Sequence, residues 1–183
     1  MPRLLDLILA LIAALAFFPF LIVIWIICIL DTQSIGIFVQ TRIGQYGKKF
    51  KIIKFRSMVA GSATTFGSWI RKYKFDELPQ LINIIKGDMA IVGPRPDIPG
   101  YYDKLVDTDL ILLNLKPGLT SPAAIEFKNE EKILAQQSDP KKFNDEILFP
   151  EKVKLNLLYQ SRKSIIYDLK VITNTIFGSI WSL

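Results

Sequence analysis

The sequence predicts a helix-rich α+β fold, with an apolar N-terminal membrane segment followed by one small domain. Three observations support this. Leu7 to Leu30 is an uninterrupted apolar run of 24 residues. Residues 51–56 show the alternation of a short β-strand, and several later segments carry apolar residues at helical spacing. We expect a membrane segment at residues 1–31 and a single compact domain at 32–183, which has the usual size of one domain.

The apolar run is long enough to cross a bilayer. A secretory signal peptide is less consistent with it, because the run exceeds a typical h-region and no small-residue cleavage site follows. Pro19 lies near its middle and predicts a kink. The basic segment after residue 40 favours the cytoplasm, but Arg3 also gives the other flank positive charge. Both a bent spanning helix and a re-entrant hairpin with cytoplasmic ends therefore fit.

A basic stretch follows the membrane segment. From Thr32 to Phe75 there is no Asp or Glu, whereas nine residues are positive: Arg42, Lys48, Lys49, Lys51, Lys54, Arg56, Arg71, Lys72 and Lys74. Such an imbalance suits a pyrophosphate or the anionic lipids of an inner leaflet. For Lys48 to Lys51, a membrane-facing surface without a catalytic role is the alternative.

Asp76 and Glu77 precede an apolar segment that we expect to be helical. Pro79 is tolerated in a first helical turn, and Gly87 is a plausible C-terminal stop. The two carboxylates would then lie at the positive end of a helix, where phosphate can also bind. One can act as a nucleophile and the other as a ligand for a hard divalent cation. The alternative is an acidic helix cap without chemistry.

Further cations are placed to bind phosphate. On a strand ending near residue 56, Lys54 and Arg56 lie on one face. Arg95 stands between two prolines that restrict its backbone, and a guanidinium binds phosphate oxygens bidentately. Alternatively, residues 93–96 are simply a rigid turn.

The composition excludes several classes of chemistry. The chain has no histidine, which removes Ser-His-Asp triads and histidine metal sites. The single cysteine, Cys28, allows no intrachain disulfide. A net charge of +6 is compatible with nucleic acid, but the membrane segment accounts for the basic bias more simply, so no nucleic-acid partner is expected.

The second half of the chain is less informative. Residues 116–120 predict a turn, and the acid-rich segment 126–151 a solvated face, although Glu126, Glu130 and Glu131 could contact a nucleotide or sugar. Near the end of the chain, apolar residues recur at helical spacing, and we expect them to pack on the core rather than lie in the membrane interface: Leu158, Ile165, Leu169, Ile172, Ile176, Ile180 and Leu183.

Several motifs, taken together and in order, resemble the small monotopic phosphoglycosyl transferases among the bacterial sugar transferases. The likeness covers nearly the whole chain. It rests on Lys54-Phe55-Arg56-Ser57-Met58, Arg71, Asp76-Glu77-Leu78-Pro79-Gln80-Leu81, Lys86-Gly87-Asp88-Met89, Val92-Gly93-Pro94-Arg95-Pro96, Lys116-Pro117-Gly118-Leu119-Thr120 and Tyr167-Asp168-Leu169-Lys170.

The resemblance implies a re-entrant membrane helix broken near Pro19, amphipathic interfacial helices and a catalytic domain on the cytoplasmic face of the bacterial inner membrane. It implies transfer of a phosphosugar from a UDP-sugar to a polyprenyl phosphate, usually undecaprenyl phosphate, with release of UMP as glycan assembly begins. Asp76 would be the nucleophile that forms a covalent phosphosugar intermediate, and Glu77 the Mg²⁺ ligand. The phosphate-binding positions would be Lys54, Arg56, Arg71 and Arg95.

Two departures concern sugar and nucleotide recognition. The turn at 116–120 is followed by Ser121-Pro122-Ala123-Ala124-Ile125-Glu126, where many members have a Gly-Trp-Ala-Gln type of segment, and Asn156 stands where many carry aspartate. A membrane phosphatase or pyrophosphatase and a non-catalytic phosphate-binding module are the alternative functions. The sequence does not identify the sugar, the glycan pathway or the oligomeric state.

Overall fold

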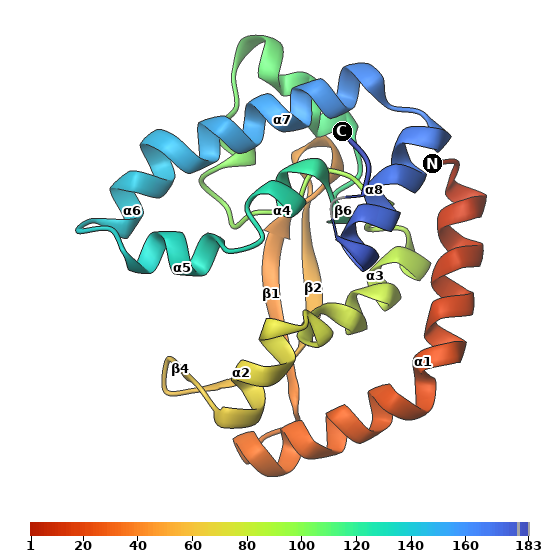
Figure 1. Ribbon diagram of the computed structural model, residues 1–183, viewed down its shortest axis with the longest axis vertical. Coiled ribbons are helices and arrows are strands. Elements are labelled where there is room, and N and C mark those ends of the chain that lie inside the picture. Colours follow the sequence, from red (N-terminus) through yellow and green to blue (C-terminus); the bar gives the residue numbers. More distant parts are fainter. Residues whose placement is uncertain (179, 183) are drawn as a thin grey trace. The chain divides into compact units, whose positions relative to one another are not determined.

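The computed structural model describes residues 1–178 and 180–182, and it confirms the helix-rich α+β class (Figure 1). The chain forms two compact units, each built from separate stretches of sequence. The N-terminal unit comprises Pro2–Arg42 and Lys49–Met89. The C-terminal unit comprises Met1, Ile43–Lys48 and the described residues from Ala90 on. The expected boundary at residue 31 between membrane segment and catalytic domain stays a prediction.

The N-terminal unit combines short helices with two small β-hairpins. Strand β1 pairs with β2, and β3 pairs with β4 in antiparallel register. The elements in chain order are α1 (Arg3–Thr32), β1 (Ile37–Ile43), β2 (Lys49–Phe55), β3 (Met58–Val59), β4 (Ser62–Ala63), α2 (Thr65–Lys72), the 3-10 helix η2 (Phe75–Gln80) and α3 (Leu81–Lys86).

Helix α1 is long and apolar enough to cross a membrane, and most of its surface is not buried. It is bent partway along its length (Figure 1), as expected of a helix that contains Pro19. Near its start, the Arg3 guanidinium donates hydrogen bonds to the carbonyl oxygens of Ile84 (2.5 Å) and Ile85 (2.8 Å), in the last turn of α3. At its other end, Asp31 accepts a hydrogen bond from the Thr64 hydroxyl. Both ends of α1 are therefore bound to the same unit.

Helix α2 packs closely against the chain that follows β2. Thr64 caps the helix by accepting a hydrogen bond from the Gly67 N–H (2.8 Å). A Cβ atom on Gly67 would lie 1.9 Å from the Ser57 carbonyl oxygen, so only glycine fits there. On its inner side α2 contributes Ile70 to a core that also contains Ile24, Cys28 and Phe55.

The C-terminal unit surrounds one short parallel strand pair, β5 with β6. Its elements are η1 (Gln45–Gly47), β5 (Ala90–Val92), η3 (Tyr102–Lys104), η4 (Asp107–Asn114), β6 (Gly118–Thr120), α4 (Pro122–Glu126), α5 (Glu130–Ala135), α6 (Pro140–Phe143), the π-helical turn η5 (Asn144–Leu148), α7 (Phe149–Arg162) and α8 (Ile165–Phe177).

The turn expected at residues 116–120 is only partly correct. Gly118–Thr120 is a strand, which pairs Gly118 with Ala90 and Thr120 with Val92. The backbones approach closely here, because a Cβ on Gly118 would lie 2.1 Å from the Gly93 nitrogen. The glycine thus permits strand contact rather than marking a turn alone.

The expectation that the last apolar residues pack on the core is wrong for most of them. Leu158, Ile165, Leu169, Ile176 and Ile180 are exposed, and Leu183 lies outside the described residues. The buried positions of α7 and α8 are instead Val153, Asn156, Tyr159, Asp168, Val171 and Asn174. Part of the buried face is polar, and its polar groups bond to one another: the Tyr159 hydroxyl donates to Asp168 (2.7 Å). The apolar pattern therefore predicted the wrong buried face for these helices.

Candidate active site

The predicted carboxylates lie in the first turn of η2, within the N-terminal unit. Lys74 adopts a left-handed conformation (φ 60°) that turns the chain out of α2, and its carbonyl accepts from the Glu77 N–H (3.2 Å). Asp76 and Glu77 are both buried, at 5% and 6% exposure. Gly87, with φ 95°, ends α3 as the sequence predicts. The local chain therefore places two adjacent carboxylates in a desolvated position.

Asp76 combines burial with an unused hydrogen-bonding atom. Its Oδ1 is buried and has no hydrogen-bond partner in the structure. Burial raises the pKa of the Asp76 carboxyl above its usual value, and the adjacent Glu77 carboxylate raises it further. Three cations oppose that shift: Lys54, Arg71 and Lys74. A buried carboxylate oxygen without a partner is costly, and such sites are commonly functional.

Glu77 is paired with one of the predicted cations. The Lys54 ammonium lies 3.1 Å from Glu77 Oε1, and both side chains are largely buried. Lys54 reaches this position from β2, which begins at Lys49 and ends at Phe55, close to the strand expected. Lys54 therefore contacts Glu77 directly, and its positive charge also acts on Asp76, so the three residues form one site.

Asn83 fixes the position of the strand that carries Lys54, and sequence reasoning did not find it. It lies on α3 and is 1% exposed. Its side chain accepts from the Ile53 N–H (3.1 Å) and donates to the Lys51 carbonyl (2.8 Å), so it bonds to the backbone of β2 on both sides of Ile52. Its only sequence signal is a polar residue at an inward position of an apolar helix, which requires a buried partner.

Two further predicted cations belong to the same unit. The Arg56 backbone N–H donates to the Gly36 carbonyl (2.9 Å), whereas its side-chain Nε is buried without a partner. Arg71 lies in the last turn of α2, where Nη1 contacts the Met58 sulfur (3.4 Å). The unpaired Nε of Arg56 can donate to a phosphate oxygen, and the unpaired Oδ1 of Asp76 can accept from a donor or a cation that binds with the phosphate.

Arg95 belongs to the C-terminal unit and is not placed relative to Asp76. It lines a small pocket of about 10 Å³ together with Gly44, Pro94, Pro96 and Tyr102, among others. That volume holds no more than a water molecule. Its phosphate-binding role stays a prediction.

The carboxylates fit a magnesium ion that is held jointly by protein and substrate. Among the described residues no group of three or more Asp, Glu, His or Cys side chains could hold a metal. Mg²⁺ does not require such a cage, because one or two carboxylates plus substrate phosphates commonly complete its shell. Buried Glu77, beside the unpartnered Oδ1 of Asp76, supplies donors of that kind.

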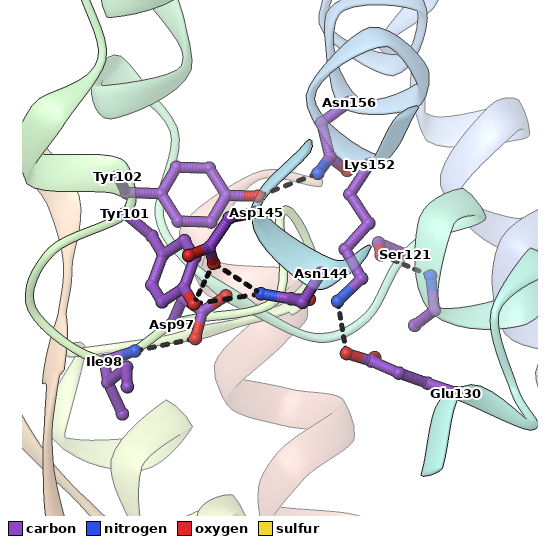
Figure 2. A network of polar contacts seen from close by, with 11 residues as sticks. Asp97, Ile98, Tyr101, Tyr102, Ser121, Glu130, Asn144, Asp145, Lys152 and Asn156 are labelled. Carbon is purple, nitrogen blue, oxygen red and sulfur yellow. Dashed lines mark hydrogen bonds and ion pairs between the residues drawn. The ribbon is translucent and has the colours of Figure 1, made fainter. Parts of the chain in front are cut away.

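A second polar cluster lies in the C-terminal unit, where Figure 2 shows side chains from η3, η5 and α7 turned toward one another. The Asn156 amide donates to the Tyr102 hydroxyl (2.9 Å), while its Oδ1 is buried without a partner. Tyr101 donates to Asp145 (2.7 Å), and that bond with the carboxylate raises the pKa of the Tyr101 hydroxyl. Sequence reasoning flagged Asn156 but missed both tyrosines.

Glu130, one of the acidic residues considered for sugar or nucleotide contacts, forms an ion pair. Its carboxylate lies 2.5 Å from the Lys152 ammonium (Figure 2). Glu126 ends α4, and Glu131 lies on α5. Their recognition roles stay predictions.

Comparison with known proteins identifies related sequences along the whole chain. The Bacterial sugar transferase family matches residues 1–182. The UDP-glucose:undecaprenyl-phosphate glucose-1-phosphate transferase of Escherichia coli (strain K12) is 32% identical over 94% of this chain and 38% of its own length. An uncharacterized sugar transferase of Bacillus subtilis (strain 168) is 32% identical over 76% of this chain and 67% of its own.

A third relative comes from Aeromonas hydrophila. Its UDP-N-acetylgalactosamine-undecaprenyl-phosphate N-acetylgalactosaminephosphotransferase is 34% identical over 54% of this chain and 27% of its own length. The chain thus spans less than half the length of the E. coli and A. hydrophila relatives and about two thirds of the B. subtilis relative. The family match over residues 1–182 shows that this chain belongs to the bacterial sugar transferase family.

Proposed function

We propose that this protein transfers a phosphosugar from a UDP-sugar to a polyprenyl phosphate, most simply undecaprenyl phosphate. Family membership and the names of the E. coli and A. hydrophila relatives support the substrate classes. The observation that carries the proposal is buried Asp76, with its unpartnered Oδ1 among the charges of Lys54, Arg71 and Lys74. This arrangement suits a nucleophile that attacks a phosphate.

The reaction has two steps. In the first, an Asp76 carboxylate oxygen attacks the phosphorus that bears the sugar. A bond forms between that oxygen and phosphorus, and the bond to the bridging oxygen breaks, so that UMP leaves with the electron pair. In the second, an oxygen of the polyprenyl phosphate attacks the same phosphorus. The Asp76 carboxylate is then released, and the lipid carries a sugar diphosphate.

The cations account for the charge that moves during these steps. Lys54, Arg56 and Arg71 would hold phosphate oxygens and offset the charge developing on them, with Arg95 as a further candidate. Glu77 would hold Mg²⁺, which would offset negative charge on the reacting phosphate. Lys54 orients the Glu77 carboxylate through their 3.1 Å contact.

The membrane segment is proposed to be re-entrant. Arg3 and Asp31, near the two ends of α1, bind Ile84, Ile85 and Thr64 of one and the same unit. A straight crossing of the bilayer would place these ends on opposite faces. The proposed location is the bacterial inner membrane, with the unit that contains Asp76 on the cytoplasmic face and anionic lipids beside its basic residues.

Intact-protein mass analysis tests this function. The purified protein is incubated with Mg²⁺ and a panel of UDP-sugars without lipid. We expect a phosphosugar adduct that Asp76→Asn abolishes and added undecaprenyl phosphate discharges. Asp107→Asn is the matched control, because Asp107 is exposed in a left-handed conformation (φ 51°) that asparagine also adopts.

Other outcomes identify the alternatives. An adduct that decays to free sugar phosphate without lipid would indicate a phosphatase or pyrophosphatase. UMP release that requires lipid, with no adduct, would indicate direct transfer and would contradict the role of Asp76. No reaction with any donor would favour the non-catalytic binding module.

A further inference from the structure

The N-terminal unit carries a row of aromatic rings beside the candidate nucleophile, and two of these rings are exposed. The row, here called the aromatic ladder, consists of Phe66 and Trp69 on α2, Tyr73 directly after α2, and Phe75 on η2, and each ring contacts at least one other. Ring centroids are 5.5 Å apart for Trp69–Tyr73 and for Trp69–Phe75, and 5.9 Å apart for Tyr73–Phe75. Phe75 is the residue before Asp76, so the ladder leads to the site.

Two rings of the ladder are exposed and two are partly core. Trp69 and Tyr73 are 44% and 50% exposed, whereas Phe66 and Phe75 are partly buried and pack against the cluster that contains Ile70. Single exposed aromatics are common, but contiguous exposed rings mark a binding surface. Tyrosine and tryptophan suit a ligand that is apolar on one side and polar on the other.

Positive charges alternate with the rings. Arg71, Lys72 and Lys74 separate Trp69, Tyr73 and Phe75 in the sequence. The Lys72 ammonium lies 5.3 Å from the Tyr73 ring centroid, and the charges of Arg71 and Lys74 act on Asp76. The ligand that matches this surface has an anionic head next to Asp76 and a long apolar tail over the rings.

We propose that the aromatic ladder binds the first isoprene units of the polyprenyl phosphate acceptor. Each isoprene unit is flat at its double bond and carries a methyl group, so it packs against a ring face better than a flexible saturated chain does. The inference rests on the proposed function for the identity of the ligand. It adds which residues recognise the tail, and it makes Trp69 and Tyr73 determinants of acceptor affinity.

The first test separates acceptor binding from donor chemistry. In detergent micelles with farnesyl phosphate as acceptor, Trp69→Ala and Tyr73→Ala should each raise the acceptor KM about fivefold to tenfold. Adduct formation from the UDP-sugar alone should stay within about twofold of the unaltered protein. Tyr73→Phe, which keeps the ring face, should keep the original KM.

Phe18→Ala is the matched control. Phe18 is an exposed aromatic of the same unit that makes no ring contact with the ladder among the described residues. Its acceptor KM should not change. An equal rise in KM for Phe18→Ala, or no rise for either ladder variant, would show that the rings do not recognise the acceptor specifically, and the inference would be overturned.

A second readout is independent of turnover. In Asp76→Asn, photo-crosslinking with a farnesyl phosphate that carries a photoreactive group at its first isoprene should label residues 66–75. Labelling confined to α1 or α8 would overturn the inference. If no adduct ever forms in the unaltered protein but the ladder is labelled, the proposed reaction is wrong while the prenyl phosphate surface stands.

Discussion

Burial of Asp76 costs the protein stability when its carboxylate is ionised, because the charge is then held away from water. Its pKa is raised by burial first and by Glu77 second. A carboxyl whose pKa is raised on folding contributes stability below its unfolded pKa, and that contribution is lost as pH rises through the folded pKa. The ionised form of Asp76 therefore opposes folding.

Asp76→Asn should accordingly raise Tm at pH 7 while abolishing adduct formation. The amide removes the charge that burial and Glu77 disfavour. Differential scanning calorimetry of both proteins across pH checks this: the difference in Tm should shrink as pH falls through the raised pKa of Asp76 and should be gone below the usual value of an Asp carboxyl, about 3.9. A lower Tm for Asp76→Asn at pH 7 would mean that the cations, not burial, dominate.

The same shift predicts a pH dependence of catalysis. Asp76 attacks only when ionised, so the rate of adduct formation should fall on acidification at a pH above the usual range of an Asp carboxyl. Lys74→Asn should move this acidic limb further upward, because Lys74 lowers the pKa and asparagine accepts its left-handed backbone (φ 60°). Rapid-quench measurement of adduct formation against pH gives both curves, and an unmoved limb would contradict this assignment.

At the scale of elements, the site depends on how closely α2 packs against the chain that follows β2, and on how α3 holds β2. Gly67→Ala should lower the free energy of unfolding by about 3 kcal/mol, because the new Cβ would lie 1.9 Å from the Ser57 carbonyl oxygen and force α2 away. Ser68→Ala, an exposed change on the same helix, should stay within about 0.5 kcal/mol. Urea denaturation measures both, and equal stability of the two variants would contradict the packing described.

Asn83→Leu should destabilise the protein by about 2–4 kcal/mol and reduce adduct formation even where the protein is still folded. Leucine leaves the Ile53 N–H and the Lys51 carbonyl without their partner, so β2 and Lys54 lose their fixed position against α3. Urea denaturation and single-turnover kinetics separate the two effects. If the folded variant forms the adduct at the normal rate, Lys54 is positioned without the two hydrogen bonds of Asn83.

The sequence predicted those parts of the site that are local. Asp76 and Glu77 lie in a first helical turn as expected, but that turn belongs to the 3-10 helix η2, and α3 begins only after Pro79. Gly87 ends α3, and Lys54 lies on the expected strand. Asn83 was missed because its partners are on another element. The ladder was missed because Phe66, Trp69 and Tyr73 have the helical spacing of a core face, and only the fold shows two of them exposed. For the same reason α8 was assigned the wrong buried side.

At the scale of the whole molecule, the course of α1 is open to direct test. In a Cys28→Ala background, single cysteines at Leu4 and Ser34 should both react with a membrane-impermeant maleimide from the cytoplasmic side, in inverted membrane vesicles. Neither should react in right-side-out spheroplasts. Labelling of the two positions from opposite sides would show a spanning helix and refute the re-entrant proposal.

The bend in α1 has a consequence for where the two substrates meet. Divided at Pro19, the helix Arg3–Thr32 has arms of about 16 and 13 residues, roughly 24 and 20 Å long at 1.5 Å per residue. Neither arm reaches across a hydrocarbon layer about 30 Å thick. With both arms returning to one unit, the protein would occupy a single leaflet, and it would draw its lipid sideways from that leaflet while its soluble donor arrives from the water above.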